Sequence, residues 1–136
     1  MKLFLVLIIS IFSLVACQIA PKDEDLIGEW KYTKFECLNQ NLDCPKVDLP
    51  TTQPSIVFQK NGKAAIYSSG KILSKGTYYL EDEIIRYEEI LPNGQLRKIP
   101  FLIKKINQNE FVFETMETQV KRVTAKKQKN NVIKPI

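Results

Sequence analysis

Histidine is absent from the chain, and tryptophan occurs only once. Without histidine there can be no Ser-His-Asp or Cys-His catalytic arrangement, and most types of zinc site are excluded. Neighbouring acids such as Glu88 and Glu89 would point to opposite faces of a strand, so they do not form a carboxylate pair. We therefore expect no enzyme, no catalytic residue and no metal or cofactor.

Long apolar runs are also scarce: one lies near the start, and no second run could span a membrane. Residues 3–14 are apolar except for Ser10 and Ser13, and they follow Lys2. A run of about a dozen residues is too short to cross a hydrocarbon core of about 30 Å as a helix. A positive start, a short apolar run and small residues at its end are typical of a secretory signal peptide. We predict one over residues 1–16.

The run ends in Leu14-Val15-Ala16-Cys17, which resembles the bacterial lipobox. The resemblance implies that the Cys17 sulfur carries a diacylglycerol, that the signal is cleaved before Cys17, and that further acyl chains such as palmitate anchor the protein. Several acyl chains bind a protein stably to a membrane, whereas a single chain gives only marginal membrane binding. We expect a membrane-anchored lipoprotein of the cell envelope, on the periplasmic or surface face of the outer membrane.

Residues 17–25 are predicted to be the lipidated cysteine and a flexible tether. The acidic run in this segment resembles the surface-export signals of some Bacteroidetes lipoproteins, and a plain solvated linker explains it equally well. The net charge of +5 comes from the other end, where residues 121–136 hold six bases and no acid. Residues 17–120 hold thirteen bases and fifteen acids, so no basic face for a nucleic-acid partner is expected. Residues 126–136 are predicted to be a disordered basic tail, either solvated or attracted to anionic lipid.

Cysteine occurs three times, and Cys37 and Cys44 remain once Cys17 is assigned to the anchor. An exported protein meets oxidising conditions, so we favour a Cys37–Cys44 disulfide, worth roughly 2.5 kcal/mol in the chain-entropy model. A thiolate metal site would need more ligands than this neighbourhood offers. A redox pair is more often spaced C-x-x-C.

Residues 26–125 show strand patterns and no convincing helical period. Asn61-Gly62 is the strongest hairpin signal, and we interpret it as a two-residue turn that pairs Lys60 with Lys63. A meander of eight short strands predicts an all-β barrel or sandwich. The expected strands are 26–36, 55–60, 63–68, 71–80, 83–91, 95–105, 110–116 and 119–125.

Hairpin parity divides these strands into an apolar inner face and a mostly charged outer face. The division is imperfect, because the apolar residues Val57, Ile66, Leu102 and Val112 are assigned to the outer face. In the same way, the charged residues Glu89 and Lys105 are assigned to the inner face. The expected inner residues are Trp30, Tyr32, Ile56, Phe58, Ala65, Tyr67, Ile72, Gly76, Tyr78, Leu80, Ile85, Tyr87, Ile99, Phe101, Ile103, Phe111, Phe113, Val120 and Arg122.

The first expected strand begins with Gly28-Glu29-Trp30. Gly-x-Trp ahead of an eight-strand meander resembles the lipocalins, in particular the small bacterial lipocalin-like lipoproteins; Phe58 with Asn61-Gly62, and Gly76-Thr77-Tyr78, also fit. The resemblance covers residues 26–125. It implies an eight-stranded antiparallel up-and-down barrel whose floor is closed by Gly28, Trp30 and an overlying Arg122. The chain departs from larger lipocalins in lacking a helix beside the barrel and in placing its disulfide in the first loop.

An eight-stranded barrel is just wide enough to be filled by side chains or to hold one small ligand. Our first hypothesis is a binding protein that takes a small hydrophobic or amphipathic ligand at its open end, with the Cys37–Cys44 loop shaping or covering the mouth. The alternative is a solid-cored barrel that acts as a protein-interaction or enzyme-inhibitor module with an envelope protein as partner. The expected ligand contacts are Tyr32, Phe58, Tyr67, Tyr78, Tyr87, Phe101 and Phe113, with Lys34 and Glu36 nearer the rim.

Overall fold

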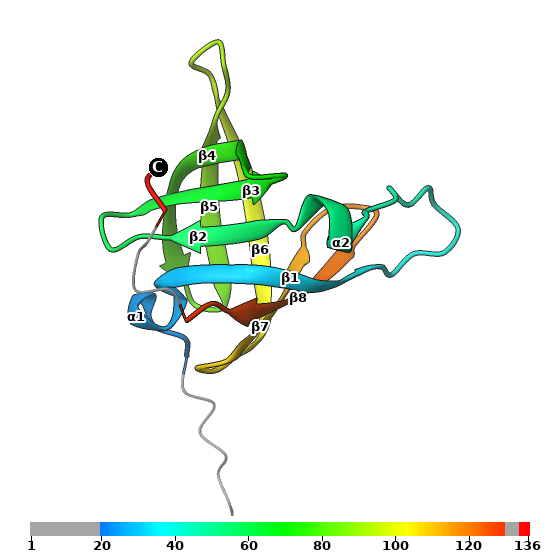
Figure 1. The fold of residues 1–136 in the computed structure, drawn as a ribbon, viewed down its shortest axis with the longest axis horizontal. Helices are drawn as coiled ribbons and strands as arrows, with labels where there is room; N and C mark the ends of the chain where they lie inside the picture. Colours follow the sequence, from blue (N-terminus) through cyan, green and yellow to red (C-terminus); the bar gives the residue numbers. More distant parts are fainter. Residues whose placement is uncertain (1–19, 130–133) are drawn as a thin grey trace, which may run out of the picture.

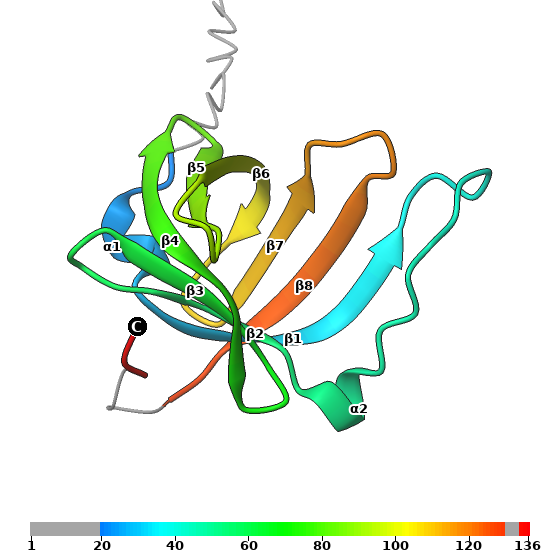
Figure 2. The same ribbon diagram turned by 90° about the horizontal axis from the view of Figure 1, so that it is seen from above.

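Eight antiparallel strands follow one another around a closed barrel, and β1 pairs with β8 to complete it (Figures 1 and 2). The computed structural model describes residues 20–129 and 134–136, so the expected signal peptide and Cys17 lie outside the described residues. The predicted all-β up-and-down barrel is confirmed. The strands are β1 Gly28–Cys37, β2 Ser55–Phe58, β3 Lys63–Ser68, β4 Lys71–Glu81, β5 Ile84–Ile90, β6 Leu96–Ile106, β7 Glu110–Thr115 and β8 Lys121–Lys127.

Two single-turn helices, α1 Asp23–Leu26 and α2 Leu49–Thr52, accompany the barrel in the described part of the chain. The Asp25 carboxylate accepts a 2.9 Å hydrogen bond from the Lys22 backbone N–H at the start of α1. The Asp48 carboxylate caps α2 by accepting from the Thr51 backbone N–H at 3.3 Å. Neither helix was predicted, because four residues are too few to show a helical period. No helix among the described residues is long and apolar enough to cross a membrane.

The core is most completely buried at the end of the barrel where β1 begins. Leu26, Trp30, Phe58 and Phe111 have no exposed surface there. The Trp30 indole N–H donates to the Leu26 carbonyl oxygen at 2.8 Å, which satisfies the buried polar group of the ring. Leu26 is the last residue of α1, and its buried side chain closes the floor of the barrel. The sequence pattern had placed Leu26 in the first strand.

The β2–β3 hairpin has a three-residue loop where a two-residue turn was predicted. The Gln59 backbone N–H donates to the Lys63 carbonyl oxygen at 2.9 Å, and Gly62 adopts a φ of 79°. A left-handed glycine at the end of a three-residue loop is a common hairpin geometry. The extra residue shifts the register by one, so Ala65 and Tyr67 face outward and their predicted inner placement is wrong.

Irregularities in β4 and β6 explain several other departures from simple alternation. The bulge in β4 shifts the register back by one residue, so Tyr78 and Leu80 join the core as predicted. Ile72 precedes that bulge and is 43% exposed, which contradicts its predicted burial. The bulge in β6 turns Lys105 outward, where its Nζ lies 3.1 Å from Glu110 Oε1. Bulges of this kind leave no clear mark in a short apolar–polar pattern.

The β7–β8 connection reverses the predicted parity of the last strand. Five residues separate the two strands, so Ala125 is buried and Arg122 faces outward with its Nε 2.8 Å from Glu114 Oε2. The prediction that Arg122 packs over Trp30 is therefore wrong, as is the inner placement of Val120, which precedes β8. Lys127 supplies the cation, with its Nζ 5.0 Å from the centroid of the Trp30 ring.

A small apolar cluster lies on the outer face of β2 and β3. Val57 and Ala65 have no exposed surface, Tyr67 is 8% exposed, and Ile136 packs against them. The last residues of the chain lie beside these strands in Figures 1 and 2. The expected disordered tail over 126–136 therefore differs from the structure at both ends, since β8 extends to Lys127 and residues 134–136 dock on the barrel.

Candidate ligand-binding site at the open end

Aromatic side chains fill the interior of the barrel. Five of the predicted ligand contacts, namely Phe58, Tyr78, Tyr87, Phe101 and Phe113, are at most 8% exposed and belong to one core cluster. Their ring centroids lie 4.9 Å apart for Phe58 and Tyr78, 5.1 Å for Phe101 and Phe113, and 6.1 Å for Tyr87 and Phe101. These rings pack against one another as a core, so a ligand in contact with all of them would have to displace side chains.

The other two predicted contacts lie in different surroundings. Tyr32 is half-buried against Phe113, with the ring centroids 6.0 Å apart, and burial raises the pKa of its phenol. Tyr67 lies on the outer face, where its hydroxyl donates to the Pro135 carbonyl oxygen. The structure thus separates Tyr67 from the interior residues with which it was grouped.

Toward the open end, β4 and β5 separate. Their ladder ends at the Gly76–Glu89 pair, beyond which β4 continues alongside β3 to Lys71 and β5 continues alongside β6 to Ile90. Figure 1 shows the β5–β6 hairpin projecting beyond the rest of the barrel. Between the β3–β4 and β5–β6 hairpins lies an open hollow of about 750 Å³, which we call the slot; it is lined by residues 72–75, 89–92, 94 and 97.

Gly76 marks the point at which the two strands meet most closely. A Cβ built at this position would lie 1.8 Å from the Glu88 carbonyl oxygen, a distance that no side chain tolerates. Glycine within a strand often indicates such a close approach of two backbones. The Gly76-Thr77-Tyr78 pattern seen in the sequence therefore lies at the base of the slot.

Four polar side chains form a connected network at that base. The Glu89 side chain is 10% exposed, and its Oε1 lies 2.7 Å from an Arg97 terminal nitrogen. The Ser74 hydroxyl donates to Glu89 Oε2 and also lies 2.7 Å from the Tyr87 hydroxyl. Because a serine has one hydroxyl hydrogen, Tyr87 must be the donor to Ser74.

Burial raises the pKa of Tyr87 to about 12; the Ser74 hydrogen bond lowers it in part, and the nearby Glu89 charge raises it. The phenol therefore keeps its proton, and its donor role, at neutral pH. The Tyr87 ring lies in the aromatic core while its hydroxyl reaches the slot. Tyr87 is thus the predicted ligand contact that connects the aromatic core with the slot.

Glu89, Arg97 and Ser74 were not predicted as site residues. The strand pattern did assign Glu89 to the inner face, as a charged exception among apolar residues. Glu89 and Arg97 are register partners across the β5–β6 hairpin. A hairpin centred on Asn93, in the Pro92-Asn93-Gly94 turn, would have placed the two opposite charges side by side.

Exposed apolar side chains gather on the loops and strand ends of the open end. Of the nine large apolar side chains that are exposed among the described residues, only Tyr79 lies away from this end. The other eight give the open end an apolar rim. They are Leu38, Leu42, Val47, Ile72, Leu73, Ile90, Leu96 and Met116.

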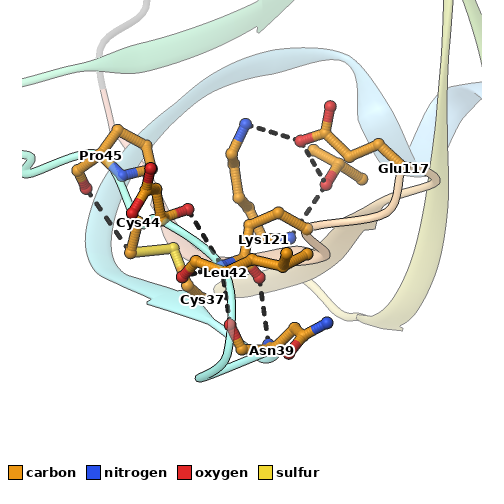
Figure 3. Close-up of a disulfide and its surroundings, with 10 residues drawn as sticks. Cys37, Asn39, Leu42, Cys44, Pro45, Glu117 and Lys121 are labelled. Atoms are coloured by element: carbon orange, nitrogen blue, oxygen red, sulfur yellow. Dashed lines mark hydrogen bonds and ion pairs between the residues drawn. A yellow bond between two sulfur atoms is a disulfide. The ribbon is translucent and has the colours of Figure 1, made fainter.

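The predicted Cys37–Cys44 disulfide is confirmed, with the two Cα atoms 5.9 Å apart. Figure 3 shows its loop against the β7–β8 connection, near Glu117 and Lys121. The Gln119 side chain links the two segments, donating to the Asn39 carbonyl oxygen at 2.8 Å and accepting from the Asn39 N–H at 3.1 Å. The loop projects sideways from the barrel in Figures 1 and 2, so it extends the rim on the β1 side and does not cover the slot.

A second hollow, of about 770 Å³, lies outside the barrel at the opposite end, lined by α1 residues, Lys60, Tyr78 and Tyr79. It is a surface gap beside α1, and the Tyr78 hydroxyl next to it already donates to the Gln59 carbonyl oxygen at 2.8 Å. We favour the slot because it alone of the two has a buried charged network at its base. Within residues 20–129 and 134–136, no three His, Cys, Asp or Glu side chains are placed to hold a metal ion.

No protein-family model and no curated protein matches the chain. Among solved structures, the chain is similar to a lipocalin-like protein from Bacteroides uniformis, with a TM-score of 0.52 over 75% of this chain and 98% of that chain. The fold is lipocalin-like. At 18% sequence identity the likeness concerns architecture, and it agrees with the lipocalin-like barrel that Gly28-Glu29-Trp30 implied.

Proposed function

We propose that this protein is a lipid-anchored, non-enzymatic binding protein of the cell envelope that takes a small amphipathic ligand into the slot of its lipocalin-like barrel. The observation that carries the proposal is the composition of the slot, in which apolar side chains surround a few fixed polar groups. Small-molecule sites are generally built in this way. Because the aromatic rings below pack against one another, the ligand would occupy the slot and not the deep interior.

The proposed anchor gives the slot a direction. Only residues 18–22 lie between Cys17 and α1, and a tether of that length spans at most about 20 Å. Since α1 lies at the filled end of the barrel, acyl chains on Cys17 would hold that end against the membrane. The slot would then open away from the anchoring membrane, and ligand would enter from the aqueous side.

Ligand binding can be tested with the mature chain carrying Cys17→Ser, exported behind an ordinary signal peptide so that no lipid is attached. We expect twelve-carbon amphiphiles to bind in calorimetry, and Leu73→Asp to abolish binding by placing a charge in the slot. Leu38→Asp, on the disulfide loop, is the matched control and should bind normally. If no amphiphile binds, and a solvent extract of natively purified protein contains no small molecule, the proposal is wrong.

The anchor can be tested separately in cells supplied with an alkyne analogue of palmitate. We expect the wild-type protein to incorporate the label and to fractionate with membranes. Cys17→Ser should lose both properties, while Cys37→Ser should keep the label. Mass spectrometry that found an unmodified Cys17 sulfur in the mature protein would contradict the lipoprotein proposal.

The apolar rim favours a second candidate, a protein-interaction module with an envelope protein as partner. Crosslinking in intact cells should then recover a specific protein with wild type and lose it with Leu42→Asp, which changes the rim outside the slot. Amphiphile binding by Leu42→Asp should be unaffected. Loss of the partner with unchanged ligand binding would support this candidate, and absence of any crosslinked partner would remove it.

A further inference from the structure

The charges that a ligand can reach in the slot are positive; this inference rests on the proposed binding function and specifies the ligand. The Glu89 side chain is 10% exposed and is already contacted by Ser74 and Arg97. The Arg97 side chain, by contrast, is 61% exposed. An incoming molecule would therefore meet the guanidinium before the carboxylate.

Arg97 also has more hydrogen-bond donors than its contact with Glu89 uses. A guanidinium carries five N–H donors and no acceptor. The terminal nitrogen of Arg97 lies 2.7 Å from Glu89 Oε1, yet that oxygen receives no hydrogen bond of acceptable geometry within the described residues. The contact compensates the buried charge of Glu89 through one terminal nitrogen of Arg97, so the other N–H groups of the guanidinium can turn toward an acidic group in the slot.

Neighbouring lysines strengthen this positive character. Among the residues that line the slot, Lys75 and Arg97 are the cations and Glu89 is the single anion, and Lys71 comes one residue before the lining. Lys75 lines the slot from the outward face of β4, since its register partner Ala65 faces outward, and it takes part in no ion pair among the residues that the structure describes. An acidic group in the slot that contacts Lys75 and Arg97 would gain charge-assisted hydrogen bonds, which are about twice as strong as neutral ones.

The remaining wall of the slot is apolar. Ile72, Leu73 and Ile90 are 43%, 71% and 44% exposed. Adjacent apolar side chains that stay in water are stabilised when a ligand covers them. We propose that the slot binds an anionic amphiphile, whose carboxylate or phosphate group lies on Arg97 and Lys75 and whose apolar chain covers Ile72, Leu73 and Ile90.

The test compares probes that share a twelve-carbon chain and differ in charge, each below its micellar concentration. We expect dodecanoate and dodecyl phosphate to bind the Cys17→Ser mature chain at least about tenfold more tightly than neutral dodecyl maltoside or cationic dodecyltrimethylammonium. Inorganic phosphate alone should bind much more weakly than dodecyl phosphate. The ratio between the two anionic probes identifies the preferred acid group.

Variants locate the charge that makes the difference. Lys75→Gln should weaken only the anionic probes, by roughly three- to tenfold. Arg97→Gln alone would leave Glu89 buried without its cation and could prevent folding. The double variant Glu89→Gln/Arg97→Gln removes both charges together and should abolish the preference for anions. Lys98→Gln, on the next residue but on the outer face opposite Glu88, is the matched control and should bind as wild type.

The outcomes separate this inference from the proposed function. Equal affinity for all four amphiphiles, or a loss in Lys98→Gln as large as in Lys75→Gln, would overturn the inference and leave a binding protein without charge preference. Inorganic phosphate that binds as tightly as dodecyl phosphate would overturn the amphiphile part. If no amphiphile binds at all, the proposed function itself fails.

Discussion

Two groups hold the indole of Trp30 at the filled end of the barrel. Its ring N–H donates to the Leu26 carbonyl oxygen at 2.8 Å, and Lys127 Nζ lies 5.0 Å from its centroid. Gly28 makes room for that lysine, since a Cβ there would come within 3.0 Å of Lys127 Cε. The lipocalin resemblance implied Arg122 over the tryptophan, and the structure places Lys127 there instead.

We predict that Lys127→Gln lowers the free energy of unfolding by about 1 kcal/mol, because a partly desolvated cation–π contact is lost. The change should also alter the fluorescence of Trp30, the only tryptophan in the chain. Lys126→Gln removes the same charge from the exposed neighbour and should change neither quantity measurably. If Arg122→Gln, and not Lys127→Gln, perturbed the emission, our assignment of the cation would be wrong.

Tyr87 leads to a prediction about alkaline stability. Burial raises its pKa to about 12, whereas a tyrosine in an unfolded chain ionises near about 10. Between these values the unfolded state has lost the proton and the folded state still holds it, so stability falls as the pH rises. Below about pH 10 this contribution is fully present.

The melting temperature of Tyr87→Phe should therefore fall less steeply than that of wild type between about pH 10 and 12. Lysine deprotonation weakens ion pairs equally in both proteins, so the difference between the curves isolates the phenol. Identical slopes would mean that Tyr87 ionises as readily in the folded state as in the unfolded chain.

At the scale of elements, the strands could be read from the sequence but their faces could not. Every expected strand overlaps an observed one, with ends that differ by at most two residues. Loop length and bulges decide which residues face inward, and neither is visible in apolar alternation. Tyr67 and Arg122 were misplaced for this reason, while Tyr78 was placed correctly because a loop error and a missed bulge cancelled.

The slot was not predicted, because it too depends on strand pairing that apolar alternation does not show. It exists because the β4–β5 ladder stops at Gly76 while each strand continues with its other neighbour. Such a divergence depends on the curvature of the whole sheet and not on the pattern within one strand. The inward-facing Glu89 was the visible sign, since a buried charge in a strand needs a partner.

The docked residues 134–136 are an element that contributes to stability. Lys134 Nζ lies 3.2 Å from Glu29 Oε2 and 4.8 Å from the Tyr67 ring centroid, and its carbonyl oxygen accepts from the Gln59 side chain at 2.9 Å. Ile136 packs on the apolar cluster of β2 and β3, including Val57. The contacts combine apolar burial with an ion pair and a hydrogen bond.

Deleting residues 134–136 should lower the free energy of unfolding by roughly 1–2 kcal/mol, because Val57 and Tyr67 become exposed. Chemical denaturation measures the change, and amide hydrogen exchange should speed up in β2 and β3. Ile136→Ser should show part of the effect, whereas Lys129→Ala, at an exposed site, should show none. Unchanged exchange in β2 and β3 after the deletion would contradict the docked arrangement.

At the scale of the whole molecule, the basic end of the chain balances acids of the barrel. Lys121 pairs with Glu117 at 2.6 Å, Arg122 with Glu114 at 2.8 Å and Lys134 with Glu29 at 3.2 Å. Exposed pairs contribute little stability individually, but they leave fewer free charges for anionic lipid. Under the proposed lipidation of Cys17, the acyl chains would supply the membrane attachment, with the filled end toward the membrane and the slot away from it.

Chemical-shift mapping of the isotopically labelled Cys17→Ser mature chain, titrated with dodecanoate, tests most directly whether the slot is the binding site. Our account predicts that the largest amide shifts fall in residues 71–76 and 89–97, on the two hairpins that diverge above Gly76. Shifts concentrated instead on core residues such as Phe58 and Phe113, or on α1 at the filled end, would contradict it.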